Sequence, residues 1–371
     1  MHPPPGVVGG ERYGFLCNDT TRRGTQRVPG EVLVRIACLL VAWLLITANA
    51  QAQALLHDVP DATGTSPSAA TPPPSAGAPT VFRSGIDIVA LNVVVTDAGA
   101  KFVTGLEPKD FAVFEDGVQQ EVTFFAATAV PLDMAILLDT SASMNDKMQE
   151  VQQAATGFAA TLREGDRAMV VDIKDATRIL QPLSADIDGA KAAIASTKAK
   201  GGTALYNGVY TTLKELIKQR RASDDVRRQA IVVLSDGDDT ASLVTFDDVM
   251  AQAKESGIAI YTITLRSPSV LQPTATRHYF SESEFSMKAL AQETGARAFF
   301  PAAITDLAGV YSSIAAELAS QYAIGYVPKN PLRDGRFRKL TVRVTDHPGA
   351  APRTRSGYVA PRPDRKAAGT N

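Results

Sequence analysis

An almost unbroken apolar run between residues 132 and 138 constrains the fold of this chain more than any other feature. Such a run is typical of a strand that is buried on both faces, as in parallel sheets. It ends at Asp139, and the hydroxyls of Ser141 and Ser143 follow at alternate positions. Apolar residues then recur every three or four positions from 144 to 162, which predicts an amphipathic helix. The hydroxyls are therefore expected on a strand-to-helix turn.

Two further stretches place polar side chains at comparable turns. A second apolar strand is predicted at 230–234 and runs into Asp236, while the glycines at 201–202 deliver Thr203 to the start of a helix. In an open parallel sheet, ligands bind in the crevice beyond the carboxyl ends of the strands. The polar residues expected to converge on one point are Asp139, Ser141, Ser143, Thr203 and Asp236.

The three motifs, D-x-S-x-S, G-G-T and S-D-G, occur in an order that resembles the von Willebrand factor A (VWA) domain. The resemblance implies an α/β fold over residues 128–320, with a Rossmann-like, doubly wound and mostly parallel sheet. It also implies a metal-ion-dependent adhesion site, because all five positions of the family's site are matched. In that family the residues at Ser141, Ser143 and sometimes Thr203 bind the metal directly, whereas those at Asp139 and Asp236 often act through water.

Oxygen ligands of this kind favour Mg²⁺, with Mn²⁺ or Ca²⁺ as alternatives, over zinc or copper. Neutral hydroxyls leave most of the ion's charge unquenched, so an Asp or Glu of a partner can supply the missing ligand. The expected function is therefore metal-dependent protein binding or adhesion through an acidic residue of a partner. A simpler interpretation stays open, in which Ser143 is a helix N-cap and Asp139 is a turn acid.

The segments that flank the α/β region have all-β patterns. Asp116-Gly117 between alternating apolar residues predicts a hairpin, with a return strand to residue 125, and a last strand is predicted at 353–359. Residues 83–127 and 321–360 are predicted to build one smaller sandwich into which the VWA domain is inserted. Several short sequence segments resemble those of a family of secreted bacterial proteins described as VWFA-related. They are Val95-Thr96-Asp97, Val103-Thr104-Gly105-Leu106, Asp110-Phe111, Phe114-Glu115-Asp116-Gly117 and Ser235-Asp236-Gly237-Asp238-Asp239-Thr240.

The first 52 residues have the features of a secretory signal peptide. Arginines precede an apolar run at 36–48, and small alanines follow it at positions 50 and 52. Cleavage there would give a secreted or periplasmic protein, with cell-surface association as a further option. An uncleaved signal anchor is the alternative and the one expected contact with a membrane. Residues 53–82 and 361–371 are predicted to be a disordered Pro/Ala/Ser linker and a disordered tail.

Other classes of function find less support in the composition. A formal net charge of -1 argues against nucleic-acid binding. The chain has only four histidines and lacks the motifs of zinc proteases, serine hydrolases, P-loop proteins and dinucleotide-binding enzymes, so an enzyme is not expected. Asp238 and Asp239 are interpreted as solvated loop acids. The remaining alternatives are an envelope scaffold that binds without metal and, with less support, a metal-dependent hydrolase.

Overall fold

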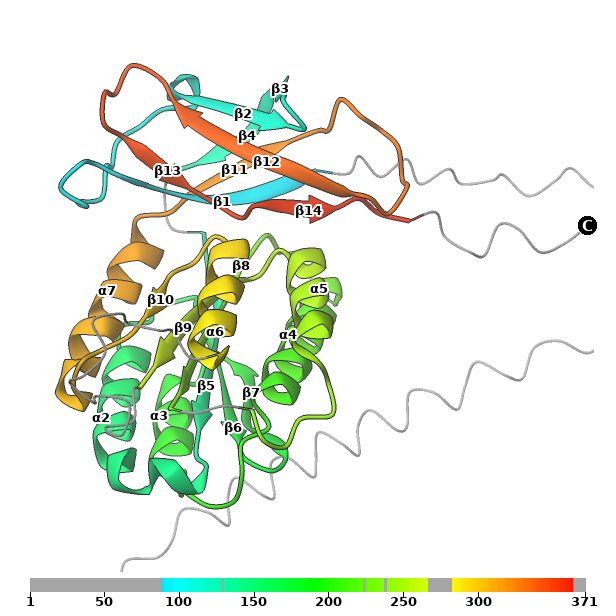
Figure 1. The fold of residues 1–371 in the computed structure, drawn as a ribbon. Helices are drawn as coiled ribbons and strands as arrows, with labels where there is room; N and C mark the ends of the chain where they lie inside the picture. Colours follow the sequence, from blue (N-terminus) through cyan, green and yellow to red (C-terminus); the bar gives the residue numbers. More distant parts are fainter. Residues whose placement is uncertain (1–87, 128–129, 223–224, 237–238, 266–281, 363–371) are drawn as a thin grey trace, which may run out of the picture. The chain divides into compact units, whose positions relative to one another are not determined.

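The computed structural model describes residues 88–127, 130–222, 225–236, 239–265 and 282–362 (Figure 1). The predicted signal peptide and linker, and most of the predicted tail, lie outside these residues. None of the described helices is long and apolar enough to cross a membrane.

The central α/β domain is built on a six-stranded sheet with the order β10-β9-β8-β5-β6-β7. The strands are β5 (Leu132–Asp139), β6 (Arg167–Ile173), β7 (Thr177–Ser184), β8 (Arg228–Ser235), β9 (Ala259–Thr264) and β10 (Ala298–Phe299). All neighbouring strands run parallel except the edge pair of β6 and β7. This arrangement confirms the predicted α/β class with a mostly parallel sheet.

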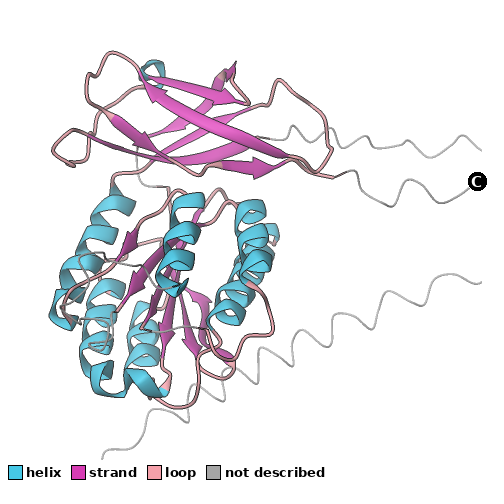
Figure 2. Cartoon of the chain, viewed as in Figure 1, coloured by secondary structure: helices cyan, strands magenta, loops and turns pink. Residues whose placement is uncertain are grey.

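Helices lie on both sides of this sheet (Figure 2). They are α2 (Met148–Ala159), α3 (Ile187–Ala195), α4 (Leu205–Arg221), α5 (Phe246–Ser256), α6 (Glu282–Glu293) and α7 (Leu307–Ala319). The large apolar side chains buried on α2, α3 and α7 belong to one core cluster, and those on α4, α5 and α6 belong to another. The sheet is therefore covered on both faces, as a doubly wound fold requires.

The central strand β5 shows why its sequence is apolar without alternation. Met134, Ile136 and Leu138 belong to the core cluster that contains α2 and α7, whereas Ala135 and Leu137 belong to the cluster that contains α4 and α5. Successive side chains of a strand point to opposite faces, so a strand covered on both sides needs apolar residues at consecutive positions. The polar exceptions within β5 are its two acids, near each end.

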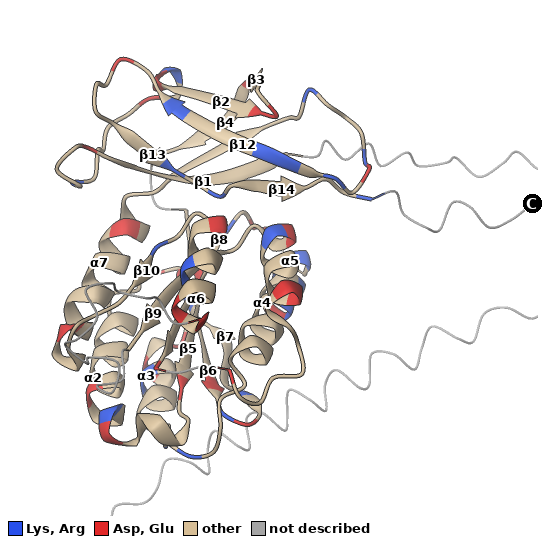
Figure 3. Ribbon diagram, in the orientation of Figure 1, with Lys and Arg blue, Asp and Glu red and all other residues tan. Residues whose placement is uncertain are grey.

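The helices differ from the expectation from sequence at two places. The helix expected from 144 to 162 is a six-residue 3₁₀ segment, η3 (Ala142–Lys147), followed by α2. Helix α3 was not predicted, although Asp186 caps it by accepting a hydrogen bond from Gly189 N at 2.8 Å. Helix α5 begins after the cap residue Thr245 and has an acidic first turn and a lysine in its last turn (Figure 3).

Two four-stranded antiparallel sheets are formed by the segments on either side of the α/β domain. Their orders are β13-β1-β11-β4 and β14-β12-β2-β3. The strands are β1 (Val89–Thr96), β2 (Phe111–Glu115), β3 (Val118–Gln120), β4 (Val122–Ala126), β11 (Tyr322–Tyr326), β12 (Phe337–Val344), β13 (Ala351–Arg353) and β14 (Gly357–Val359). One apolar cluster, with Val93 and Ile324 from the first sheet and Val113 and Leu340 from the second, packs between them.

Two strands predicted as continuous are each divided between the two sheets. The return strand of the predicted hairpin breaks at Glu121, so that β3 pairs with β2 whereas β4 pairs with β11. The predicted strand at 353–359 likewise divides into β13, which pairs with β1, and β14, which pairs with β12. Strands that change sheets form the corners of a sandwich. Because the apolar alternation hardly changes at such a corner, the sequence pattern does not reveal it.

Candidate metal site

Polar side chains at the carboxyl ends of β5 and β8 form one continuous chain of hydrogen bonds. Asp139 Oδ2 accepts a hydrogen bond from Ser235 Oγ at 2.6 Å, and Asp139 Oδ1 accepts one from Ser141 N at 2.9 Å. Ser141 Oγ lies 3.0 Å from Ser143 Oγ, which donates to Asp236 Oδ1 at 2.8 Å. The structure thus joins four of the five sequence-predicted site residues.

The fifth residue, Thr203, lies in a loop that backbone hydrogen bonds hold beside this chain. Ala142 N donates to Gly201 O at 2.9 Å, which ties the loop to the turn after β5. Thr203 N donates to Thr240 Oγ1 at 3.0 Å, and Thr203 O accepts from Thr240 N at 2.9 Å. No hydrogen bond links the Thr203 hydroxyl to another residue that the structure describes. The loop is in place, but the Thr203 side chain is not part of the network.

The site is buried at Asp139 and Ser141 and exposed to solvent at Ser143. Asp139 is fully buried and Ser141 is 2% exposed, whereas Ser143 is an exposed residue. Burial raises the pKa of Asp139, and the neighbouring charge of Asp236 raises it further, although hydrogen bonds from Ser235 and Ser141 partly offset both effects. A cation beside these carboxylates would favour the ionised form of Asp139.

The simpler interpretation took Ser143 as a helix N-cap and Asp139 as a turn acid, and the structure agrees with only the second part. Ser143 is not an N-cap, because it lies inside η3, and the residue at the cap position of that segment is Ser141, which makes no side-chain cap bond. Asp139 does stabilise the turn, because it accepts the bond from Ser141 N two residues later. The hydroxyl of Ser143 is directed toward Asp236 instead of the helix backbone.

Lys147, which lies outside the three sequence motifs, also belongs to the site. Its Nζ forms an ion pair with Asp236 Oδ2, and its side chain is 22% exposed. Its position four residues after Ser143, one helical turn along the chain, is the only signal in the sequence. A positive charge therefore already contacts this group of oxygens.

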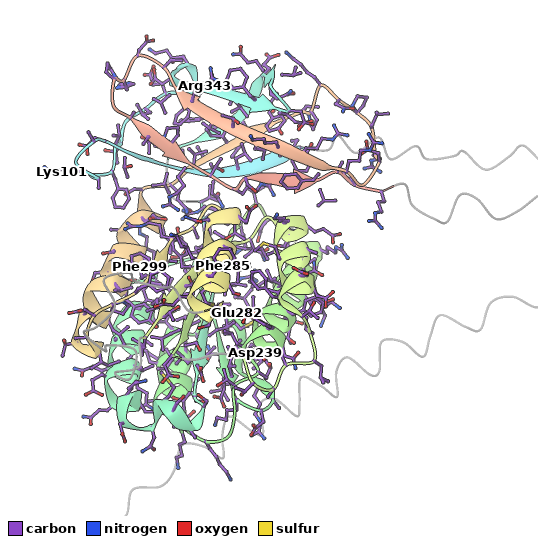
Figure 4. All side chains as sticks on the ribbon, viewed as in Figure 1. Lys101, Asp239, Glu282, Phe285, Phe299 and Arg343 are labelled. Carbon is purple, nitrogen blue, oxygen red and sulfur yellow. The ribbon has the colours of Figure 1, made fainter. Side chains whose placement is uncertain are left out.

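Asp239 has a different role from the one predicted. Its Oδ2 accepts a hydrogen bond from Tyr206 N at 2.7 Å, and its Oδ1 accepts one from Ser242 N at 2.9 Å. Asp239, labelled in Figure 4, thus holds the first turn of α4 and is not simply a solvated acid. Asp238 lies outside the described residues.

The donor atoms of the site fit a hard divalent cation. They are carboxylate and hydroxyl oxygens, which suit Mg²⁺, Mn²⁺ or Ca²⁺, whereas zinc sites are built mainly from nitrogen and sulfur ligands. Within the described ranges, no cluster of three or more His, Cys, Asp or Glu side chains could hold a metal ion. Oxygens of the kind contributed by Asp139, Ser141, Ser143 and Asp236 would suit such an ion.

Residues 133–309 match the family model of the von Willebrand factor type A domain. This segment is a VWA domain. The match spans the α/β region from β5 into α7 and includes all the residues of the candidate site. VWA domains are generally protein-binding modules, and some of them use a metal ion. No match was found among curated proteins.

Several solved structures are similar to this chain. A von Willebrand factor type A protein from Catenulispora acidiphila is 14% identical, with 77% of this chain and 76% of that chain covered and a TM-score of 0.43. The vWF domain of the type V pili tip protein Mfa5 from Porphyromonas gingivalis is 15% identical (51% and 95% covered, TM-score 0.40). Proximal thread matrix protein 1 of the mussel byssus, described with a zinc-occupied MIDAS motif, is 16% identical (56% and 50% covered, TM-score 0.42).

The Gly201→Ala substitution is expected to weaken both the loop and metal binding. Gly201 has φ +81°, and an added Cβ would collide with the carboxylate of Asp175, which accepts a hydrogen bond from Gly202 N at 2.6 Å. The substitution should lower the free energy of unfolding by about 1–2 kcal/mol. Urea unfolding and metal titration would measure both effects. Gly157→Ala is the matched control, since an added Cβ there meets no atom within 4 Å; an equal loss in both variants would contradict the assignment.

Proposed function

We propose that this chain is an exported protein-binding or adhesion module that captures an acidic residue of a partner through a Mg²⁺-loaded site. The residues proposed to hold the metal are Asp139, Ser141, Ser143, Thr203 and Asp236. The observation that carries the proposal is the chain of oxygens from buried Asp139 to exposed Ser143, which spans the ends of two neighbouring parallel strands.

The proposed roles follow from burial and charge. The hydroxyls of Ser141 and Ser143 would contact the ion directly, while Asp139 and Asp236 balance its charge. Asp139 also holds the backbone N–H of Ser141, and Asp236 orients the Ser143 hydroxyl. When bound, the ion would supply a strongly electrophilic centre, because its direct ligands from this chain are mostly neutral. A partner's carboxylate would approach from the exposed side, beside Ser143. Mn²⁺ and Ca²⁺ are the alternative metals.

Export and the absence of catalysis are parts of the same proposal. The signal-peptide pattern of residues 1–52 supports a secreted or periplasmic location. VWA domains are mostly interaction modules without enzymatic activity, and among the described residues the site pairs no nucleophile with a histidine base. Metal-dependent hydrolysis would be supported only if the protein turned over a substrate and Asp139→Ala abolished that turnover.

Binding of a labelled peptide of repeated glutamates tests the proposal, with the corresponding glutamine peptide as the matched control. In Mg²⁺ the fluorescence anisotropy of the glutamate peptide should rise on addition of the protein, and EDTA should reverse the rise. The glutamine peptide should not bind. Binding of the glutamate peptide that persists in EDTA would contradict metal-dependent capture and favour a scaffold that needs no metal.

A further inference from the structure

The ion pair between Lys147 and Asp236 places a cation of the chain itself on the candidate metal site. The carboxylate of Asp236 is almost fully buried, with its side chain 1% exposed, and both of its oxygens are engaged. Oδ1 accepts the hydrogen bond from Ser143, and Oδ2 contacts the Lys147 ammonium. The same carboxylate is therefore shared between the hydroxyl network and a side-chain cation.

The charges of the site are only partly balanced in this arrangement. Asp139 is buried with hydrogen bonds from Ser235 and Ser141 and with no salt-bridge partner among the described residues, so its charge remains next to that of Asp236. Lys147 compensates one of the two carboxylates. A divalent ion would compensate both, but it would then lie close to the ammonium and be repelled by it.

We propose that Lys147 is a built-in competitor of the divalent ion, which pairs with Asp236 in the metal-free protein and must be displaced when the metal binds. This inference rests on the proposed function, because it concerns the metal affinity of the same site. It predicts that Lys147 weakens metal binding and stabilises the metal-free fold. The two effects are linked, since a group that favours the metal-free state must oppose the metal-bound state.

The chemistry of lysine suits displacement. Its ammonium is a compact, strongly hydrated charge on a flexible four-carbon chain. The Lys147 side chain is 22% exposed and extends from η3 at the surface of the domain, so its ammonium can move into water without the rearrangement of a core element. A purely structural ion pair is the other interpretation, and it predicts a loss of stability without any gain in affinity for metal.

The test is a calorimetric titration of Mn²⁺ and Mg²⁺ into metal-stripped full-length protein and its Lys147→Met and Lys147→Arg variants. Lys147→Met should bind both ions about tenfold more tightly than the wild type, whereas Lys147→Arg, which keeps the charge, should not gain affinity. Lys191→Met is the matched control, because it also removes a lysine in an ion pair, 3.0 Å from Asp188 on α3. Thermal unfolding in EDTA should show a lower Tm for Lys147→Met than for the control.

The outcomes separate this inference from the proposed function. Equal affinity of the wild type and Lys147→Met for the metal would overturn the competition but leave the metal site intact. Tighter binding by Lys147→Met and by Lys191→Met alike would also overturn it, since the effect would then reflect net charge alone. Absence of binding in every folded variant would overturn the proposed metal site and, with it, the competition.

Discussion

Asp139→Ala is expected to weaken the binding of Mg²⁺ and Mn²⁺ by about 100-fold or more, close to the limit of detection by calorimetry. The substitution removes a fully buried carboxylate and the acceptor that orients Ser141 N at 2.9 Å and Ser235 Oγ at 2.6 Å. Both the negative charge and the geometry of the turn after β5 would be lost. Asp188→Ala on the exposed side of α3 is the control and should bind metal as the wild type does.

The pKa of Asp139 provides a check that such a loss is not unfolding. Burial raises this pKa, so in the metal-free protein the ionised side chain costs stability as the pH rises above the ordinary carboxyl value of 3.8. Asp139→Asn removes the charge and nearly preserves the shape. In EDTA at neutral pH the Tm of Asp139→Asn should equal or exceed that of the wild type. Any difference in Tm should become smaller as the pH falls toward 3.8. If Asp139→Asn is markedly less stable than the wild type and does not bind metal, loss of the fold would explain the missing metal binding.

The second large effect is expected at the opposite end of the same strand. Asp133 is 1% exposed and accepts hydrogen bonds from Arg167 Nε at 2.8 Å, Arg167 Nη2 at 2.7 Å and Arg227 Nε at 2.6 Å. Asp133→Ala would leave two guanidinium groups without this partner. Because both arginines still reach water, the free energy of unfolding should fall by about 3 kcal/mol, the lower end of the range for a broken buried pair.

The pH dependence of stability gives this prediction a definite sign. Burial raises the pKa of Asp133, but the hydrogen bonds and charges of Arg167 and Arg227 outweigh it, so the pKa is lowered overall. The stabilisation is therefore present above the ordinary value of 3.8 and is lost as the pH falls through the lowered pKa. Urea unfolding should show a difference between the wild type and Asp133→Asn that is large at pH 7 and shrinks in strong acid. A constant difference would contradict the ionic origin.

Metal binding separates the two ends of β5. Asp133 and Asp139 are six residues apart, about 20 Å along an extended strand, so Asp133→Asn should destabilise the fold and still bind metal with wild-type affinity. Asp139→Asn should keep the stability of the fold and lose affinity for the metal. Measurement of stability and affinity for both variants would show whether these acids have separate roles.

The parallel core was readable from the sequence because its pattern depends on burial alone. Strands such as β5 and β8 are apolar at consecutive positions, and α5 carries its own start and stop signals in Thr245 and Gly257. Helix α3 has weaker signals, since it is only nine residues long and rich in alanine. The corners near Glu121 and Ser356 depend on which strand lies opposite, and this information is not local.

In the candidate metal site, too, some features are set by local sequence and others by tertiary structure. The spacing of Asp139, Ser141 and Ser143 fixes their place on one turn, and the ends of β5 and β8 meet because the strands are parallel neighbours. The partners of Lys147 and Asp239 are set by tertiary structure. Each of these charged side chains could equally extend into solvent, so the sequence indicated a solvated acid at Asp239 and no role for Lys147.

The most direct test of the central claim is anomalous X-ray diffraction at the manganese absorption edge from crystals of the protein grown with Mn²⁺. We expect an anomalous peak at the ends of β5 and β8, with the hydroxyl oxygens of Ser141 and Ser143 at direct-ligand distances of about 2–2.4 Å. The Lys147 ammonium should have moved away from Asp236. A well-ordered site without a peak at saturating Mn²⁺ would contradict the claim that this chain binds a divalent metal there.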